Sequence, residues 1–101
     1  MTISDCKAGK IQDGTIIWLK TITDSMQRSA VTTVGEDKTG DCIIISAYNQ
    51  VDSSLTFNQL QKVFPKEITI GIKNPYMRLW RDGISALRND NPLNIVFKED
   101  E

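Results

Sequence analysis

The chain has 101 residues, which suits one domain with a single hydrophobic core and is too short for two. Hydrophobic residues make up 40% of it and charged residues 25%, as in ordinary globular proteins. The net charge of −1 and the pI of about 5.4 argue against a generic nucleic-acid binder, which usually carries a clear basic excess.

The residues that most often carry catalysis are scarce. The chain has no histidine, so a metal site or a catalytic triad built on imidazole is excluded. Its two cysteines, Cys6 and Cys42, are too few for a structural zinc site, and we expect free thiols in a reducing compartment. No glycine-rich phosphate loop is present. We therefore expect no catalytic residues, no metal, no cofactor and no enzymatic activity.

The N-terminus and the hydropathy of the chain bear on its location. The first residues lack the basic flank and apolar run of a signal peptide, and no apolar stretch reaches membrane-spanning length. We expect an intracellular protein, nuclear or cytoplasmic, that makes no membrane contact.

Three β-rich runs separated by turn residues predict three strands in the first half of the chain. Residues 1–13 are mixed and polar, and we expect a flexible N-terminal segment there. A strand is predicted at 14–23. After a polar loop at 24–28, two further strands at 29–34 and 42–48 form a hairpin around an acidic, glycine-containing turn.

The alternation of side chains assigns faces to these strands. In the first strand, one face carries Ile17, Leu19 and Thr21, and the other carries Ile16, Trp18, Lys20 and Ile22. In the third strand we expect Ile43, Ile45 and Ala47 to point inward, with Ile44, Ser46 and Tyr48 on the outer face. The apolar run at 42–45 is continuous enough to leave open that this strand is buried on both sides.

A change of period at 54–64 predicts one helix. Its apolar stripe comprises Phe57, Leu60, Gln61 and Phe64, widened by Val63. Thr56 followed by Gln59 fits a capping box, with Ser53 or Ser54 as the alternative cap. Pro65 follows the last helical residue, which is where proline commonly stands after a helix ends.

The last third of the chain reads as strands again. Ile68, Ile70 and Ile72 alternate as the inward face of a strand that Asn74–Pro75 interrupts. Runs at 76–80 and 84–88 predict a hairpin, with Asp82–Gly83 as a two-residue turn, and a short apolar run follows at 95–97. Gly71, inside a strand pattern, predicts a bulge or a bend.

The order of strand, strand, strand, helix, strand and strand predicts an OB-fold. This is an all-β, five-stranded, antiparallel Greek-key barrel with one helix, and its second and third strands commonly bind oligonucleotides. We expect residues 14–97 to form the barrel and residues 98–101 to form an acidic tail.

Two resemblances to known families support this fold. Residues 34–48, with an Asp-x-x-Gly turn and an apolar strand ending in Tyr-Asn, resemble the second hairpin of OB-folds of the replication protein A type. More narrowly, residues 14–97 resemble the N-terminal OB-like region of TPR–SET multidomain proteins of lower eukaryotes. The segments that carry this second resemblance include Ile72–Tyr76, Asp82–Gly83 and Arg88–Pro92.

In the TPR–SET proteins, the OB-like domain precedes tetratricopeptide repeats and a SET domain. This chain contains neither the repeats nor a SET motif, so the resemblance implies an OB-fold domain, either stand-alone or cut from a larger protein. It does not imply methyltransferase activity.

Aromatic and basic residues are the candidates for a binding site, because single-stranded nucleic acids bind through rings that stack on bases and cations that follow the phosphates. Trp18, Lys20 and Tyr48 are predicted on the outer face of the first three strands. The alternative is structural, with Trp18 packed in the barrel and Tyr48 anchoring its rim.

A second aromatic and basic stripe is predicted on the late hairpin. Tyr76, Arg78 and Trp80 alternate onto one face, and Arg81 lies at the tip. Such a stripe fits base stacking, and it also fits a protein-binding hot spot. Two functions therefore stay open: binding of single-stranded DNA or RNA, and an OB domain that assembles with a larger protein or complex, for example one that is TPR–SET-like and chromatin-associated.

Overall fold

The computed structural model describes residues 1–27, 30–49, 55–79 and 83–98, and these form a mostly-β fold with one α-helix. The strands in the first half are β1 (Ile16–Thr21), β2 (Met26–Gln27), β3 (Val31–Glu36) and β4 (Cys42–Ala47). The later strands are β5 (Thr69–Lys73), β6 (Tyr76–Leu79), β7 (Ser85–Asn89) and β8 (Ile95–Phe97). The helix α1 spans Phe57–Val63, and two 3-10 turns span Ile3–Asp5 (η1) and Pro92–Asn94 (η2). The predicted class, all-β with one helix, is confirmed.

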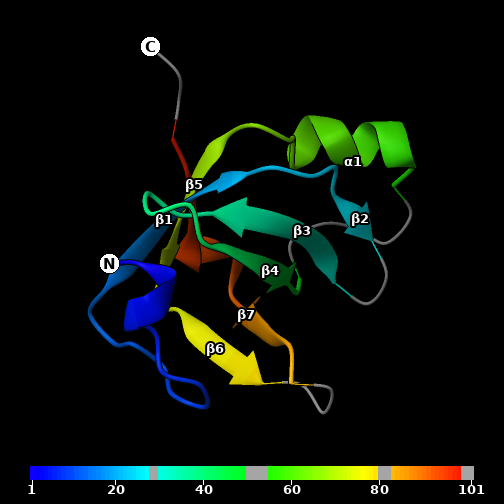
Figure 1. The fold of residues 1–101 in the computed structure, drawn as a ribbon. Helices are drawn as coiled ribbons and strands as arrows, with labels where there is room; N and C mark the ends of the chain where they lie inside the picture. Colours follow the sequence, from blue (N-terminus) through cyan, green and yellow to red (C-terminus); the bar gives the residue numbers. More distant parts are fainter. Residues whose placement is uncertain (28–29, 50–54, 80–82, 99–101) are drawn as a thin grey trace.

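All eight described strands join one mixed sheet (Figure 1). Their hydrogen-bonded order is β6-β7-β4-β3-β1-β5-β8, with β2 beside β3. β4 and β7 are parallel, whereas the other pairs in the described ranges are antiparallel. The prediction of purely antiparallel strands is therefore wrong. Side-chain periodicity shows which residues are extended, but it carries no information on the direction in which distant strands meet.

Two strands that are consecutive in the chain lie near opposite ends of the sheet. β5 and β6 lie near opposite ends of the sheet, yet two residues, Asn74 and Pro75, separate them in sequence. Asn74 has a left-handed φ of 51°, and its side-chain oxygen accepts a 2.8 Å hydrogen bond from the Gly14 N–H. Because two residues span only a few ångströms, the sheet must curl until β5 and β6 approach each other.

The inward faces of the strands build the core as the alternation predicts. The inward residues of β1, β4 and β5 are at most 5% exposed: Ile17, Leu19, Thr21, Ile43, Ile45, Ala47, Ile70 and Ile72. Ile68, which was predicted on the same inward face, precedes β5 and is only partly buried. β4 is not equally buried on both sides, because Ile44 and Tyr48 on its outer face are only half-buried.

The helix begins at the predicted cap. Thr56 Oγ1 accepts a 3.2 Å hydrogen bond from the Gln59 N–H, and Gln59 Oε1 accepts a 2.9 Å bond from the Thr56 N–H. The buried stripe is narrower than predicted, because Phe57 is 56% exposed and Val63 is 46% exposed. Helical spacing places Phe57 on the same stripe as Leu60, but the first turn of α1 extends beyond the core.

The N-terminal segment packs against the sheet. Ile3 donates its N–H to Asp37 Oδ2 at 2.8 Å, and Gly9 donates its N–H to the Met77 carbonyl at 2.7 Å. Ile11 forms an isolated antiparallel bridge with Tyr76, and Cys6 is buried. The expectation of a flexible segment at 1–13 was based on the polar composition of these residues. Composition alone does not reveal tertiary contacts with residues distant in sequence.

Gly71 does not form a bulge. The register between β1 and β5 continues without interruption from Ile16–Lys73 to Lys20–Thr69, and it pairs Gly71 with Trp18. A Cβ atom at Gly71 would lie 2.8 Å from a ring carbon of Trp18. Glycine therefore makes room for the indole ring, and Trp18 covers the bare backbone of the neighbouring strand.

Substitution by alanine should lower stability to different extents at Gly35 and Gly71, the two buried glycines in strands. A Cβ at Gly35 would lie 2.7 Å from Ile45 Cδ1 and 3.0 Å from Leu19 Cβ, both inside the core. Gly35→Ala should lower the free energy of unfolding by about 1–3 kcal/mol through overpacking. Gly71→Ala should cost less, because the half-exposed Trp18 ring can swing into solvent. Urea unfolding of both variants checks this, and an equal cost would contradict it.

Candidate nucleic-acid interface

The outer surface of β4, β7 and β6 brings aromatic and basic side chains together. The register pairs Ser46 with Arg88 and Arg88 with Tyr76, so these residues form one row across three strands. We call Tyr48, Tyr76, Arg78 and Arg88 the tyrosine–arginine face. The neighbouring Ile45, Leu87 and Met77 are buried, which confirms that the face belongs to the opposite side of the strands.

Arg88 lies at the centre of this face and is held from two sides. Its Cζ atom lies 4.4 Å from the centroid of the Tyr48 ring, in a cation–π arrangement. Its Nε donates a 3.0 Å hydrogen bond to Asp90 Oδ1. Within the described residues, Nε is the guanidinium nitrogen with a hydrogen-bond partner, so the terminal amino groups stay available to a ligand.

The environment of Arg88 favours its charged form. The hydrogen bond to Asp90 raises the pKa of Arg88, and it outweighs the opposing effect of partial burial. Tyr48 and Tyr76 also favour the cation. The side chain is 32% exposed. Arg88 is therefore a permanent, oriented cation that a phosphate can reach.

Arg88 could not be assigned to this face from the turn predicted at Asp82–Gly83. A two-residue turn there would pair Leu79 with Ala86, whereas the structure pairs Leu79 with Ser85. A shift of one residue moves every side chain to the other face of the strand. The predicted register therefore sets Arg88 opposite the inward residue Met77, and the observed register sets it opposite Tyr76.

Trp18 and Lys20 lie elsewhere on the surface. Trp18 is 43% exposed and rests over Gly71 on the outer side of β1 and β5, so it is not a core residue. Lys20 pairs with Glu36 at one end of β3, whereas Tyr48 follows Ala47, which pairs with Val31 at the other end. The five steps along the strand from Val31 to Glu36 span about 17 Å at strand spacing.

The structure therefore unites three of the seven sequence-predicted site residues. Tyr48, Tyr76 and Arg78 share the tyrosine–arginine face, while Trp18 and Lys20 lie apart from it. Trp80 and Arg81 lie outside the described residues.

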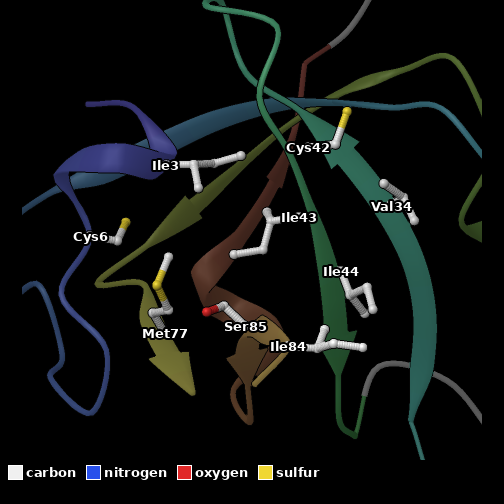
Figure 2. A pocket seen from close by; sticks show the side chains of 9 residues that line it. All are labelled: Ile3, Cys6, Val34, Cys42, Ile43, Ile44, Met77, Ile84 and Ser85. Carbon is white, nitrogen blue, oxygen red and sulfur yellow. The ribbon is translucent and has the colours of Figure 1, made fainter. Parts of the chain in front are cut away.

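An apolar groove of about 590 Å³ adjoins the tyrosine–arginine face. It opens where β4 and β7 diverge, because their pairing begins only at Ile44 and Ala86. Figure 2 shows the side chains that line this β4–β7 groove: Ile3, Cys6, Val34, Cys42, Ile43, Ile44, Met77, Ile84 and Ser85. Burial raises the pKa of the Cys6 thiol, so Cys6 adds no thiolate charge to the groove near neutral pH.

A second pocket of about 550 Å³ lies between the β1–β3 loop and the first turn of α1. Gln61 ties these two segments together: its Oε1 accepts from the Ser25 N–H at 2.9 Å, and its Nε2 donates to the Ser25 carbonyl at 2.8 Å. The exposed Met26 and Phe57 border the pocket, whose lining carries one charged residue, Asp24. The tyrosine–arginine face does not extend to this pocket, whose lining carries one ring, Phe57, and no cation.

Neither a metal centre nor a membrane span stands out in the described part of the chain. No three histidine, cysteine, aspartate or glutamate residues gather there as a possible ion site. No helix in the same ranges is long and apolar enough to cross a membrane.

Comparison with known proteins gives one similarity and no family. No protein-family model matches the chain. Over 97 residues, or 96% of its length, the chain is 25% identical to a protein of Gibberella zeae named methyltransferase. The chain spans 13% of that protein. The expectation that the chain is not an enzyme is contradicted by this similarity, weak as 25% identity is, because the similar protein is named as one.

Proposed function

We propose that this chain is an OB-type domain that works as part of a methyltransferase and binds single-stranded nucleic acid through the tyrosine–arginine face. The observation that carries the proposal is the oriented guanidinium of Arg88, which stacks on Tyr48 and donates a hydrogen bond to Asp90 through Nε. Stacking rings beside cations is the combination that single strands require.

The strand connections support the OB-type assignment. With β5 and β6 counted as one bent strand, the order is β1, β3, β4, α1, β5–β6 and β7, which gives five strands with a helix between the third and the fourth. β1 pairs with both β3 and β5, and the connection at Asn74–Pro75 brings the ends of the sheet together. In this assignment, the tyrosine–arginine face extends from the third strand to the fifth and the fourth.

The methyltransferase context rests on two likenesses. One is the resemblance to the N-terminal OB-like region of TPR–SET multidomain proteins, and the other is the similarity to the Gibberella zeae methyltransferase, of which the chain spans 13%. In that setting, the domain would hold a nucleic acid close to the site of methyl transfer.

A protein-binding OB domain is the second candidate, and the β4–β7 groove is the observation in its favour. Aliphatic side chains line most of the groove, and exposed apolar grooves often mark protein interfaces. Tyrosine and arginine are also enriched in protein-binding hot spots. Both candidates use the same side of the molecule, so direct binding measurements decide between them.

Fluorescence anisotropy with labelled single-stranded DNA and RNA tests the proposal. Tyr48→Ala should weaken binding by ~1–3 kcal/mol, the usual contribution of one base–aromatic stack. Arg88→Ala should reduce the slope of log affinity against log salt by about 0.7, the value for one phosphate contact on a single strand.

Lys20→Ala is the matched control, because it removes an exposed cation from a different part of the surface. Affinity and salt slope should stay unchanged in this variant. If the folded protein binds no oligonucleotide at low salt, the nucleic-acid proposal fails and the protein-binding candidate takes its place.

A further inference from the structure

We propose that the β4–β7 groove receives unpaired bases of single-stranded DNA and selects thymine through its 5-methyl group. The inference rests on the proposed function and narrows the ligand of the same surface. It starts from the position of the groove and from the chemistry of its lining.

The groove lies next to the tyrosine–arginine face, and its lining combines Cys42 and Ile44 from the side of that face with Ile43, Met77 and Ser85 from the inward side. Ile44 lies two residues before Ser46 on β4, and Ala86 lies two residues before Arg88 on β7. Arg78 pairs with Ala86, which pairs with Ile44, so this arginine stands in the same cross-strand row as the groove. A strand whose phosphates contact Arg78 and Arg88 therefore has the groove within reach of its bases.

The lining distinguishes bases by apolar surface rather than by hydrogen bonds. Figure 2 shows mainly aliphatic and sulfur-containing side chains around the groove, contributed by β3, β4, β6, the start of β7 with the preceding Ile84, and the N-terminal segment. Ser85 carries the one hydroxyl among the lining side chains, and none of them is charged. Thymine differs from uracil by a methyl group, the part of a base that apolar side chains contact.

The same lining gives no advantage to RNA. Proteins distinguish RNA from DNA through polar contacts to the 2′-hydroxyl, and an aliphatic wall makes no such contact. Burying one methyl group in an apolar site is worth about a fourfold change in affinity. The expected order of affinity is therefore oligo-dT above oligo-dU, with oligo-rU close to oligo-dU.

Anisotropy titrations with these three homopolymers, all of equal length, measure separately the effect of the 5-methyl group and that of the 2′-hydroxyl on affinity. Oligo-dT and oligo-dU differ in the methyl group alone, whereas oligo-dU and oligo-rU differ in the 2′-hydroxyl alone. Oligo-dT should bind about fourfold more tightly for each methyl group seated in the groove. Equal affinity for oligo-dT and oligo-dU overturns the groove inference and leaves the proposed function standing. Absence of binding to all three overturns both.

Isoleucine-to-threonine variants locate the effect, because threonine keeps a β-branched side chain and carries a hydroxyl in place of the ethyl branch of isoleucine. Ile44→Thr and Ile84→Thr should each reduce the ratio of affinities for oligo-dT and oligo-dU toward one. Ile22→Thr, at an exposed isoleucine that lines neither pocket, should keep the preference. A preference that survives both groove substitutions contradicts the assignment.

Photocrosslinking of the unmodified protein gives a test that does not depend on variants. An oligonucleotide with 5-bromouracil carries bromine where thymine carries its methyl group. Irradiation followed by peptide mapping should place the crosslink on residues that line the groove, such as Cys42 or Met77. Crosslinks confined to Trp18 would move the bases to the opposite surface and overturn the inference.

Discussion

Phe64→Ala should lower the free energy of unfolding by about 3–5 kcal/mol, as expected when a buried aromatic ring is lost and a cavity remains. Phe64 is fully buried, and its ring meets that of Phe97 edge-on, with centroids 5.4 Å apart. Its carbonyl also accepts a 2.7 Å hydrogen bond from Ser25 Oγ. For a domain of this size, each 1 kcal/mol corresponds to roughly 4–8 °C in melting temperature, so the loss should exceed about 12 °C.

Phe57→Ala is the control on the same helix. Phe57 is 56% exposed, so its truncation should change the free energy of unfolding by about 0.5 kcal/mol or less. Thermal and urea unfolding of both variants provide the measurement. If Phe57→Ala proves as costly as Phe64→Ala, the first turn of α1 lies deeper in the core than the structure places it.

Asp37→Ala should cost about 3 kcal/mol, because hydrogen bonds to a charged group are worth roughly 1.5–3 kcal/mol each and several are lost together. The carboxylate accepts hydrogen bonds from the N–H groups of Ile3, Thr39 and Asp41 at 2.8–3.1 Å, and from Thr39 Oγ1 at 2.6 Å. It therefore closes the β3–β4 turn and fastens the N-terminal segment. Asp41→Asn, which removes an exposed carboxylate from the same turn, should change stability little.

The pH dependence of stability checks the same contact. Burial opposes ionisation of Asp37, but the hydrogen bonds outweigh it and lower the pKa to about 2 from the ordinary value of 3.8. A carboxylate with a lowered pKa in the folded state stabilises fully above 3.8 and loses its contribution as the pH falls toward about 2. The difference in unfolding free energy between the wild type and Asp37→Ala should therefore shrink across this window. A constant difference would contradict the ionised contact.

The local structure was largely predictable because it depends on short-range pattern. Alternation along β4 identified Ile45 as a core residue, and along β1 it separated the face of Ile17 and Leu19, which the structure buries, from the face of Trp18. Thr56 and Gln59 identified the start of α1, because a capping box involves residues only three positions apart. Alternation also predicted Tyr48 on the outer face of its strand, and Tyr76 and Arg78 on a common face of theirs.

The chain by itself determined which residues are extended, where the helix begins and which side chains are apolar. Only the tertiary structure decided that β4 and β7 run parallel, that Trp18 rests over Gly71, and that residues 1–13 pack onto the sheet. It also decided the register that sets Arg88 beside Tyr76 and Tyr48. The physical reason is that these relations join residues distant in sequence, and one residue of register exchanges the two faces of a strand.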